Sequence, residues 1–152
     1  MTPTKIILHH SATKDGLTVS WNAIRRYHMG ECAWNDIGYH FGIELLPDQG
    51  YAAGSYEVLM GRMPDEPGAH TRDHNQDSLG VCFVGNFDAA PPHTSQLLRG
   101  VELCTWLCHA FGLLPRDIYG HREFANKTCP GTAFNLETFR LMVARRMGLP
   151  YV

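Results

Sequence analysis

The sequence lacks a strong excess of charge of either sign. Its 152 residues carry 13 Lys and Arg against 15 Asp and Glu, which gives a formal net charge of −2 with histidine neutral. Binding to a nucleic-acid backbone through general electrostatics requires a strongly basic surface, so this balance excludes that class of partner. Neutral or amphoteric substrates fit the composition better.

Long hydrophobic runs are also missing from the start of the chain. The N-terminal segment leads into an apolar run of only Ile6, Ile7 and Leu8, which is too short for the core of a signal peptide or for a membrane span. We therefore expect a soluble protein that is made in the cytoplasm without a signal peptide and that has no stable membrane association.

The five cysteines form no CxxC pair, and their odd number argues against a disulfide scaffold. Cys82, Cys104 and Cys108 lie in apolar surroundings and are expected to pack in the core. Cys129 differs, because it follows polar residues and precedes a proline. The length fits one domain with its own core, and no repeat, linker or low-complexity segment is present, so we expect a single domain over residues 1–152.

Strand and helix patterns interleave along the chain, which predicts an α/β fold with a mixed central sheet and flanking helices. In the first helix, Trp21, Ile24, Tyr27 and His28 are spaced to share the buried face. Thr94 is the expected N-cap of the longest helix, and Asn135 that of the last. A turn is expected at residues 47–50. The expected strands cover residues 5–9, 38–46, 56–60, 79–86 and 117–119, and the expected helices cover 19–29, 94–111 and 135–146.

The stretch from Tyr119 to Pro130 crowds His121, Lys127 and Cys129 into a loop, which suggests a site. His9 ends a buried strand, where α/β sheets place chemistry. Catalytic zinc takes three ligands from such side chains and leaves one position for water. Spacing alone leaves alternatives open: His10 could replace His9, His121 could be an exposed loop histidine, and Lys127 could be simply solvated.

Five ordered blocks resemble those of type 2 N-acetylmuramoyl-L-alanine amidases, above all the small bacteriophage lysozyme-type amidases, with peptidoglycan recognition proteins as more distant relatives. The resemblance covers nearly the whole chain, and it departs from the phage pattern between Leu46 and Gly61, where the hairpin looks longer. The blocks are L-H-H-S-A-T (8–13), W-N-D-I-G-Y-H-F (34–41), G-A-H (68–70), S-L-G-V-C-F-V-G (78–85) and G-H-R-E-F-A-N-K-T-C-P (120–130).

The resemblance implies a role for each matching position. His9, His121 and Cys129 are implied to bind one Zn²⁺ per chain, while Tyr39 and Lys127 match the catalytic tyrosine and lysine. His70 falls at the family's cleft histidine and is expected to contact substrate. The same expectation extends to two members of the second block, Trp34 and His40.

The implied reaction is hydrolysis of the amide between N-acetylmuramic acid and L-alanine in peptidoglycan, as in a bacteriolytic phage endolysin. Such an enzyme reaches the cell wall through a pore or lesion made by another protein, and we expect a monomer. Two alternatives stay open at this point: a wall-binding module without catalysis, and an intracellular amidase that recycles wall fragments. Cys129 and Lys127 together favour the active enzyme.

Overall fold

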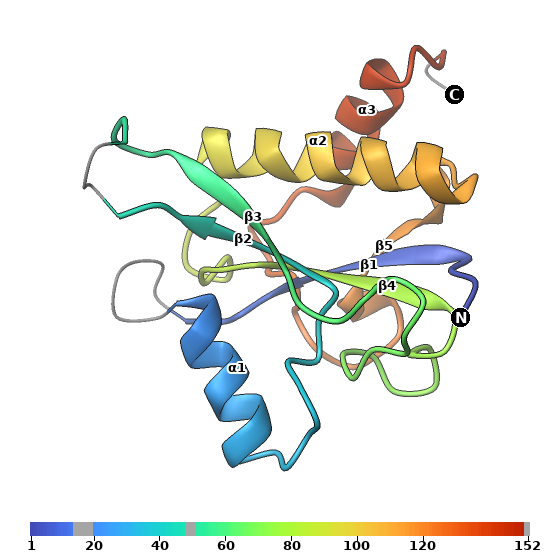
Figure 1. Ribbon diagram of the computed structural model, residues 1–152. Helices are drawn as coiled ribbons and strands as arrows, with labels where there is room; N and C mark the ends of the chain where they lie inside the picture. The colour runs from blue at the N-terminus through green and yellow to red at the C-terminus, as the bar shows by residue number, and fades with distance from the viewer. Residues whose placement is uncertain (14–19, 48–50, 151–152) are drawn as a thin grey trace.

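The fold is a five-stranded sheet with helices on both faces (Figure 1). The computed structural model describes residues 1–13, 20–47 and 51–150. In chain order the elements are β1 (Lys5–His10), α1 (Trp21–Gly30), β2 (Phe41–Leu45), β3 (Tyr56–Met60), β4 (Ser78–Phe83), α2 (Thr94–Phe111), the 3₁₀ turn η1 (Pro115–Asp117), β5 (Ile118–Gly120), the 3₁₀ turn η2 (His121–Glu123) and α3 (Leu136–Arg146).

The strands lie in the order β3-β2-β4-β1-β5. β4 pairs in parallel with β1 and β2, β5 pairs in parallel with β1, and only β3 runs antiparallel, against β2. The predicted mixed α/β sheet is therefore confirmed. The parallel strands β4, β1 and β5 end at the same edge of the sheet, where side chains from distant parts of the sequence can meet.

Two apolar clusters cover the two faces of the sheet, because successive side chains of a strand point to opposite sides. Leu79, Val81 and Phe83 of β4 join the larger cluster with α2 and α3, whereas Cys82 and Val84 pack with Trp21 and Ile24 of α1. Figure 1 shows α2 and α3 on one face of the sheet and α1 on the other. The same alternation sends Ile6 and Leu8 of β1 toward α2 and α3, and directs His9 to the face that carries α1.

The helices follow the predicted periodicity, with two corrections. Thr94 is not the N-cap of α2: the ring of His93 accepts a hydrogen bond from the Ser95 amide, which makes Thr94 the first helical residue. Tyr27 is 60% exposed, because the buried stripe of α1 is narrower than predicted and consists of Trp21, Ile24 and His28. Asn135 caps α3 as predicted, accepting from the Thr138 amide.

The strands differ from prediction mainly at their ends. β2 begins three residues late, because the carbonyls of Gly38 and Tyr39 accept hydrogen bonds from the amides of Ala69 and Arg62. β4 stops before Gly85, whose φ of +151° takes the chain out of strand geometry. The predicted turn falls largely on residues 48–50, outside the described part. All five cysteines are free, and Cys82, Cys104 and Cys108 are buried as predicted.

Candidate metal centre and substrate cavity

Three predicted ligands meet at the sheet edge where β1 and β5 end. The register pairs Leu8 with Gly120, so His9 and His121 follow at adjacent positions, with ring centroids 4.6 Å apart. Cys129 comes from the loop after η2. One ligand atom from each of the three lies within 4.8 Å of the others.

His10 does not compete with His9 for this position. Its side chain points to the other face of the sheet, where its Nδ1 accepts a hydrogen bond from the Phe87 amide at 3.2 Å. Only its backbone reaches the centre, donating from N–H to the Sγ of Cys129 at 3.4 Å. His121 is 9% exposed, which contradicts the reading of an exposed loop histidine.

The loop that carries Cys129 is fastened by two residues that the sequence reading did not single out. Arg122 donates from its backbone to the Cys129 carbonyl at 2.7 Å and from its guanidinium to the carbonyls of Gly131 and Phe134 at 2.7 and 3.2 Å. Asp88 accepts from Thr128 and Thr132 of the same loop. Only the presence of Arg122 inside the G-H-R-E block could have pointed to it.

The electrostatic surroundings keep the two imidazoles neutral. Burial lowers the pKa of His9 well below 6.5, with further lowering by His70 and His121. Burial and the nearby Lys127 ammonium also lower the pKa of His121. Burial raises the pKa of the Cys129 thiol to about 11, against the opposing effect of the His10 amide. Neutral imidazoles are ready to bind a cation, and the thiol needs a strong positive charge beside it to ionise.

The donor set fits zinc. Tetrahedral zinc with sulfur at about 2.3 Å and nitrogen at about 2.0 Å separates those two atoms by about 3.5 Å. Here the Sγ of Cys129 lies 3.7 Å from the Nδ1 of His9. The described residues place no fourth His, Cys, Asp or Glu in the cluster. Three protein ligands with a free position are typical of a catalytic zinc site rather than a closed structural one.

The second ring nitrogen of His9, Nε2, points away from Cys129 and toward other side chains. It lies 3.0 Å from the Nδ1 of His70 and 3.3 Å from the hydroxyl of Thr71. Burial lowers the pKa of His70 to about 3, so this ring is neutral as well. Thr71 is a further site residue that the sequence reading missed.

Tyr39 packs against His9, with ring centroids 5.2 Å apart. The thiol of Cys82 interacts with the Tyr39 hydroxyl. Burial raises the pKa of Tyr39 well above 10, and the nearby Cys82 and Cys129 raise it further. Tyr39 is therefore a protonated phenol beside the metal centre.

A cavity of about 550 Å³ opens next to the three ligands. It contains Lys127, an exposed side chain, and the partly buried Trp34, whose ring packs 4.6 Å from that of His28. The lining residues are Trp34, Ala69, His70, Thr71, Arg72, Asp73, Asn75, His121, Phe124, Ala125 and Lys127.

His40 is not among these lining residues. It is completely buried, its Nε2 is 2.9 Å from the Glu66 carbonyl, and its Nδ1 accepts from the Gly80 amide at 2.9 Å. Both ring nitrogens are thus occupied by backbone, which corrects the expectation that His40 contacts substrate. It holds the loop before β4 in place instead.

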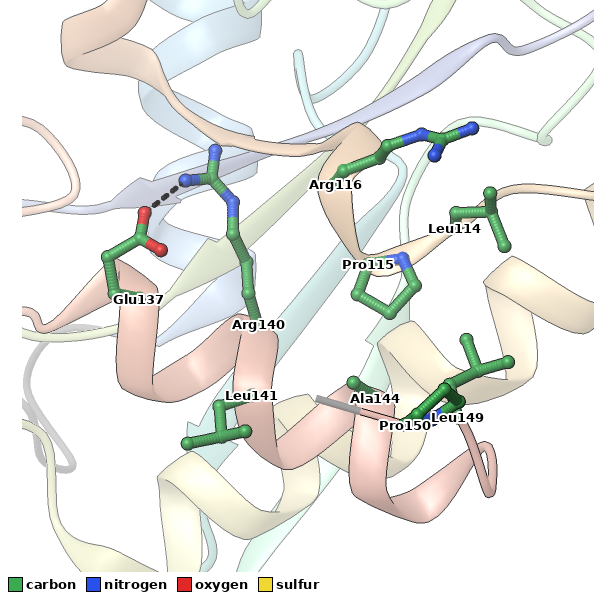
Figure 2. Close-up of a pocket in the computed structure, with 9 residues that line it drawn as sticks. All are labelled: Leu114, Pro115, Arg116, Glu137, Arg140, Leu141, Ala144, Leu149 and Pro150. Atoms are coloured by element: carbon green, nitrogen blue, oxygen red, sulfur yellow. Dashed lines mark hydrogen bonds and ion pairs between the residues drawn. The ribbon is translucent and has the colours of Figure 1, made fainter. Parts of the chain in front are cut away.

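A second cavity, of about 510 Å³, lies between α3, η1 and the residues Leu149 and Pro150 (Figure 2). Arg116 and Arg140 are its cations, and Figure 2 shows Arg140 bonded to Glu137. None of its lining residues is a predicted site residue, and the candidate metal centre belongs to the other cavity.

An α/β sheet whose strand ends bring together two histidines and one cysteine that could hold a metal ion fits the class of metal-dependent hydrolases. Comparison with known families makes this specific: the family model of N-acetylmuramoyl-L-alanine amidases (Amidase_2) matches residues 1–132. The chain belongs to this family, and the resemblance seen in the five sequence blocks is confirmed.

Individual relatives agree with the family. The chain is 34% identical to the endolysin of Enterobacteria phage K11, over 88% of this chain and 82% of that protein, and 37% identical to the endolysin of Escherichia phage T7, over 82% and 78%. It is also 36% identical to the pig N-acetylmuramoyl-L-alanine amidase, over 75% of this chain, but it spans only 18% of that longer protein.

Solved structures show the same fold. An N-acetylmuramoyl-L-alanine amidase from Clostridium intestinale superposes with a TM-score of 0.78 at 21% identity, covering 98% of this chain and 87% of that one. The bumblebee peptidoglycan recognition protein SA superposes with a TM-score of 0.72 at 27% identity, covering 90% and 80%.

Proposed function

We propose that this protein hydrolyses the amide bond between N-acetylmuramic acid and L-alanine in peptidoglycan, with one zinc ion held by His9, His121 and Cys129. The observation that carries the proposal is the open three-ligand cluster at the edge of a cavity that also contains Lys127. Family membership and the amidases and endolysins among the relatives support the same activity.

Each site residue has a distinct task in this proposal. A bound zinc ion supplies a Lewis acid and a water of lowered pKa. Lys127 lowers the energy of the negative charge that develops on the amide oxygen, a contribution of about 3 kcal/mol for one such donor. Tyr39, whose ring packs against that of His9, is the second catalytic residue, as a phenol that orients the attacking water or transfers its proton. Trp34 forms part of the cavity wall against which the substrate lies.

The variants Lys127→Ala and Cys129→Ala separate metal binding from catalysis. We expect Lys127→Ala to keep its zinc but to lose about 100-fold in kcat, because about 3 kcal/mol corresponds to that factor. Cys129→Ala loses both zinc and activity. The measurements are zinc content by elemental analysis and amide cleavage in purified peptidoglycan, with and without a chelator.

Matched controls test the specificity of these losses. Arg116→Ala removes an exposed cation from the other cavity, and Cys32→Ala removes a free cysteine outside the centre. Both should keep zinc and activity. Equal zinc contents in Lys127→Ala and Cys129→Ala would contradict the division of roles. A zinc-loaded wild-type protein that releases no peptide would instead favour a wall-binding module.

The endolysins of phages K11 and T7 among the relatives support a lytic role over recycling of wall fragments. No helix in the described part of the chain is long and apolar enough to cross a membrane. We propose that the protein reaches peptidoglycan through a membrane lesion made by another protein and acts as a monomer. Loss of turbidity in permeabilised but not in intact cells is the expected result.

A further inference from the structure

His9 has two ring nitrogens with different surroundings. Nδ1 faces the Sγ of Cys129 at 3.7 Å, whereas Nε2 faces the Nδ1 of His70 at 3.0 Å. A neutral imidazole that binds a metal through one nitrogen carries its hydrogen on the other. A metal-binding His9 therefore presents an Nε2–H donor directly to His70.

The ring of His70 is held in a slot between two glycines. A Cβ atom on Gly68 would lie 2.4 Å from the Cδ2 of His70, and one on Gly80 would lie 2.6 Å from its Cγ and Cδ2. The main chain at this point is also tied down, because the Oδ1 of Asn75 accepts from the amides of both His70 and Thr71 at 2.8 Å. The acceptor Nδ1 is therefore fixed in front of His9.

His70 has few exposed or free hydrogen-bonding groups with which to contact a substrate. Its Nδ1 is occupied by His9 and, at 3.1 Å, by the hydroxyl of Thr71. Its Nε2 is buried, and the ring also interacts with the Ser78 backbone, which opposes the lowering of the His70 pKa. Only 9% of the residue is exposed, although it forms part of the cavity wall.

We propose that His70 is a positioning residue of the metal centre, which accepts the Nε2–H of His9 and so fixes the orientation of that ligand, and that it does not recognise substrate. This inference rests on the proposed zinc site and corrects the role expected from the sequence. Outer partners of this kind set the tautomer and direction of a ligating histidine, and their loss costs about 10–100-fold in metal affinity.

Two variants of nearly equal shape isolate the acceptor. His70→Asn places an amide oxygen close to the position of Nδ1, whereas His70→Leu has no acceptor. Zinc affinity is measured by competition with a chromophoric chelator, and KM and kcat are measured on a soluble peptidoglycan fragment at saturating zinc. We expect His70→Leu to bind zinc about 10–100-fold more weakly than His70→Asn, with KM the same in both.

Each outcome decides the question. Equal zinc affinities in the two variants would overturn the positioning role. An intact zinc affinity with a raised KM would also overturn it and would restore substrate contact. If His70→Leu does not fold, a zinc affinity of His70→Asn more than about 10-fold below that of the wild type overturns it, and an affinity near that of the wild type supports it. Failure of the wild-type protein to bind zinc refutes the proposed metal site itself. Thr71→Val removes the more distant acceptor, at 3.3 Å, and is expected to weaken zinc binding less than His70→Leu does.

Discussion

Gly80→Ala tests the slot around His70 without touching the metal centre. Gly80 lies in β4, the middle strand of the sheet, and both its amide and its carbonyl are bonded to His40, at 2.9 Å each. The backbone therefore cannot yield, so the ring of His70 must move. A new Cβ at 2.6 Å requires a shift of about 0.8 Å to reach ordinary contact at 3.4 Å. That shift breaks the 3.0 Å contact between His70 and His9.

Two effects of Gly80→Ala should appear together. Overpacking of a well-filled interior costs about 1–3 kcal/mol, so the free energy of unfolding, measured by urea titration with chelator present, should fall by that amount. Zinc affinity should fall about 10-fold or more, because the Nε2–H of His9 loses its aligned acceptor.

Gly30→Ala is the control, because a Cβ at this last residue of α1 meets nothing within 4 Å. It should leave both quantities within error or raise stability slightly. If Gly80→Ala unfolds at the wild-type urea concentration and binds zinc as tightly as the wild type, the ring of His70 is not confined as described.

Two further predictions concern the loop and the buried histidines. Arg122→Ala removes two hydrogen bonds from a charged group to the carbonyls of Gly131 and Phe134. The free energy of unfolding, measured in urea, should fall by at least about 1.5–3 kcal/mol. An unchanged value would show that these hydrogen bonds do not stabilise the loop. The metal-free protein should lose stability as the pH falls below about 6.5, because the pKa of His70 is lowered to about 3 and the unfolded chain therefore takes up the proton first. This loss should approach about 1.4 kcal/mol per pH unit for one such histidine, and a flat urea midpoint between pH 7 and pH 4.5 would contradict it.

The sequence predicts much of this fold because its periodic patterns are long. The hairpin strand Tyr56–Met60 appears with the predicted bounds, and the long helix ends at Phe111 as predicted and begins one residue earlier than the predicted N-cap at Thr94 implies, since alternating or helical spacing is continuous there. Element ends are less predictable, because hydrogen bonds from distant loops decide them. For example, β2 begins later than predicted because the carbonyls of the residues before it accept hydrogen bonds from the amides of Ala69 and Arg62.

The candidate site was predicted in part. His9 could be placed at a strand end, and His121 and Cys129 in one loop, from local sequence alone. Spacing could not choose between His9 and His10; the family resemblance favoured His9, and the alternation of β1 gives the physical reason, because it directs the His10 side chain to the other face of the sheet. The contact between His9 and His70 spans 61 positions along the chain, so no local pattern reveals it. For the same reason His40, occupied by Glu66 and Gly80, looked like a cleft residue in the sequence.

His9 and Cys129 are 120 positions apart, and the two are brought together only when β5 has paired with β1 and the loop after it has been fastened by Arg122. A growing chain that has been synthesised as far as β4 already contains His9, Tyr39 and His70, yet it has only one of the three proposed ligands. With the proposed zinc site, hydrolytic activity therefore requires a chain that extends at least through Cys129. An incomplete chain released early from the ribosome would be inert toward the cell wall.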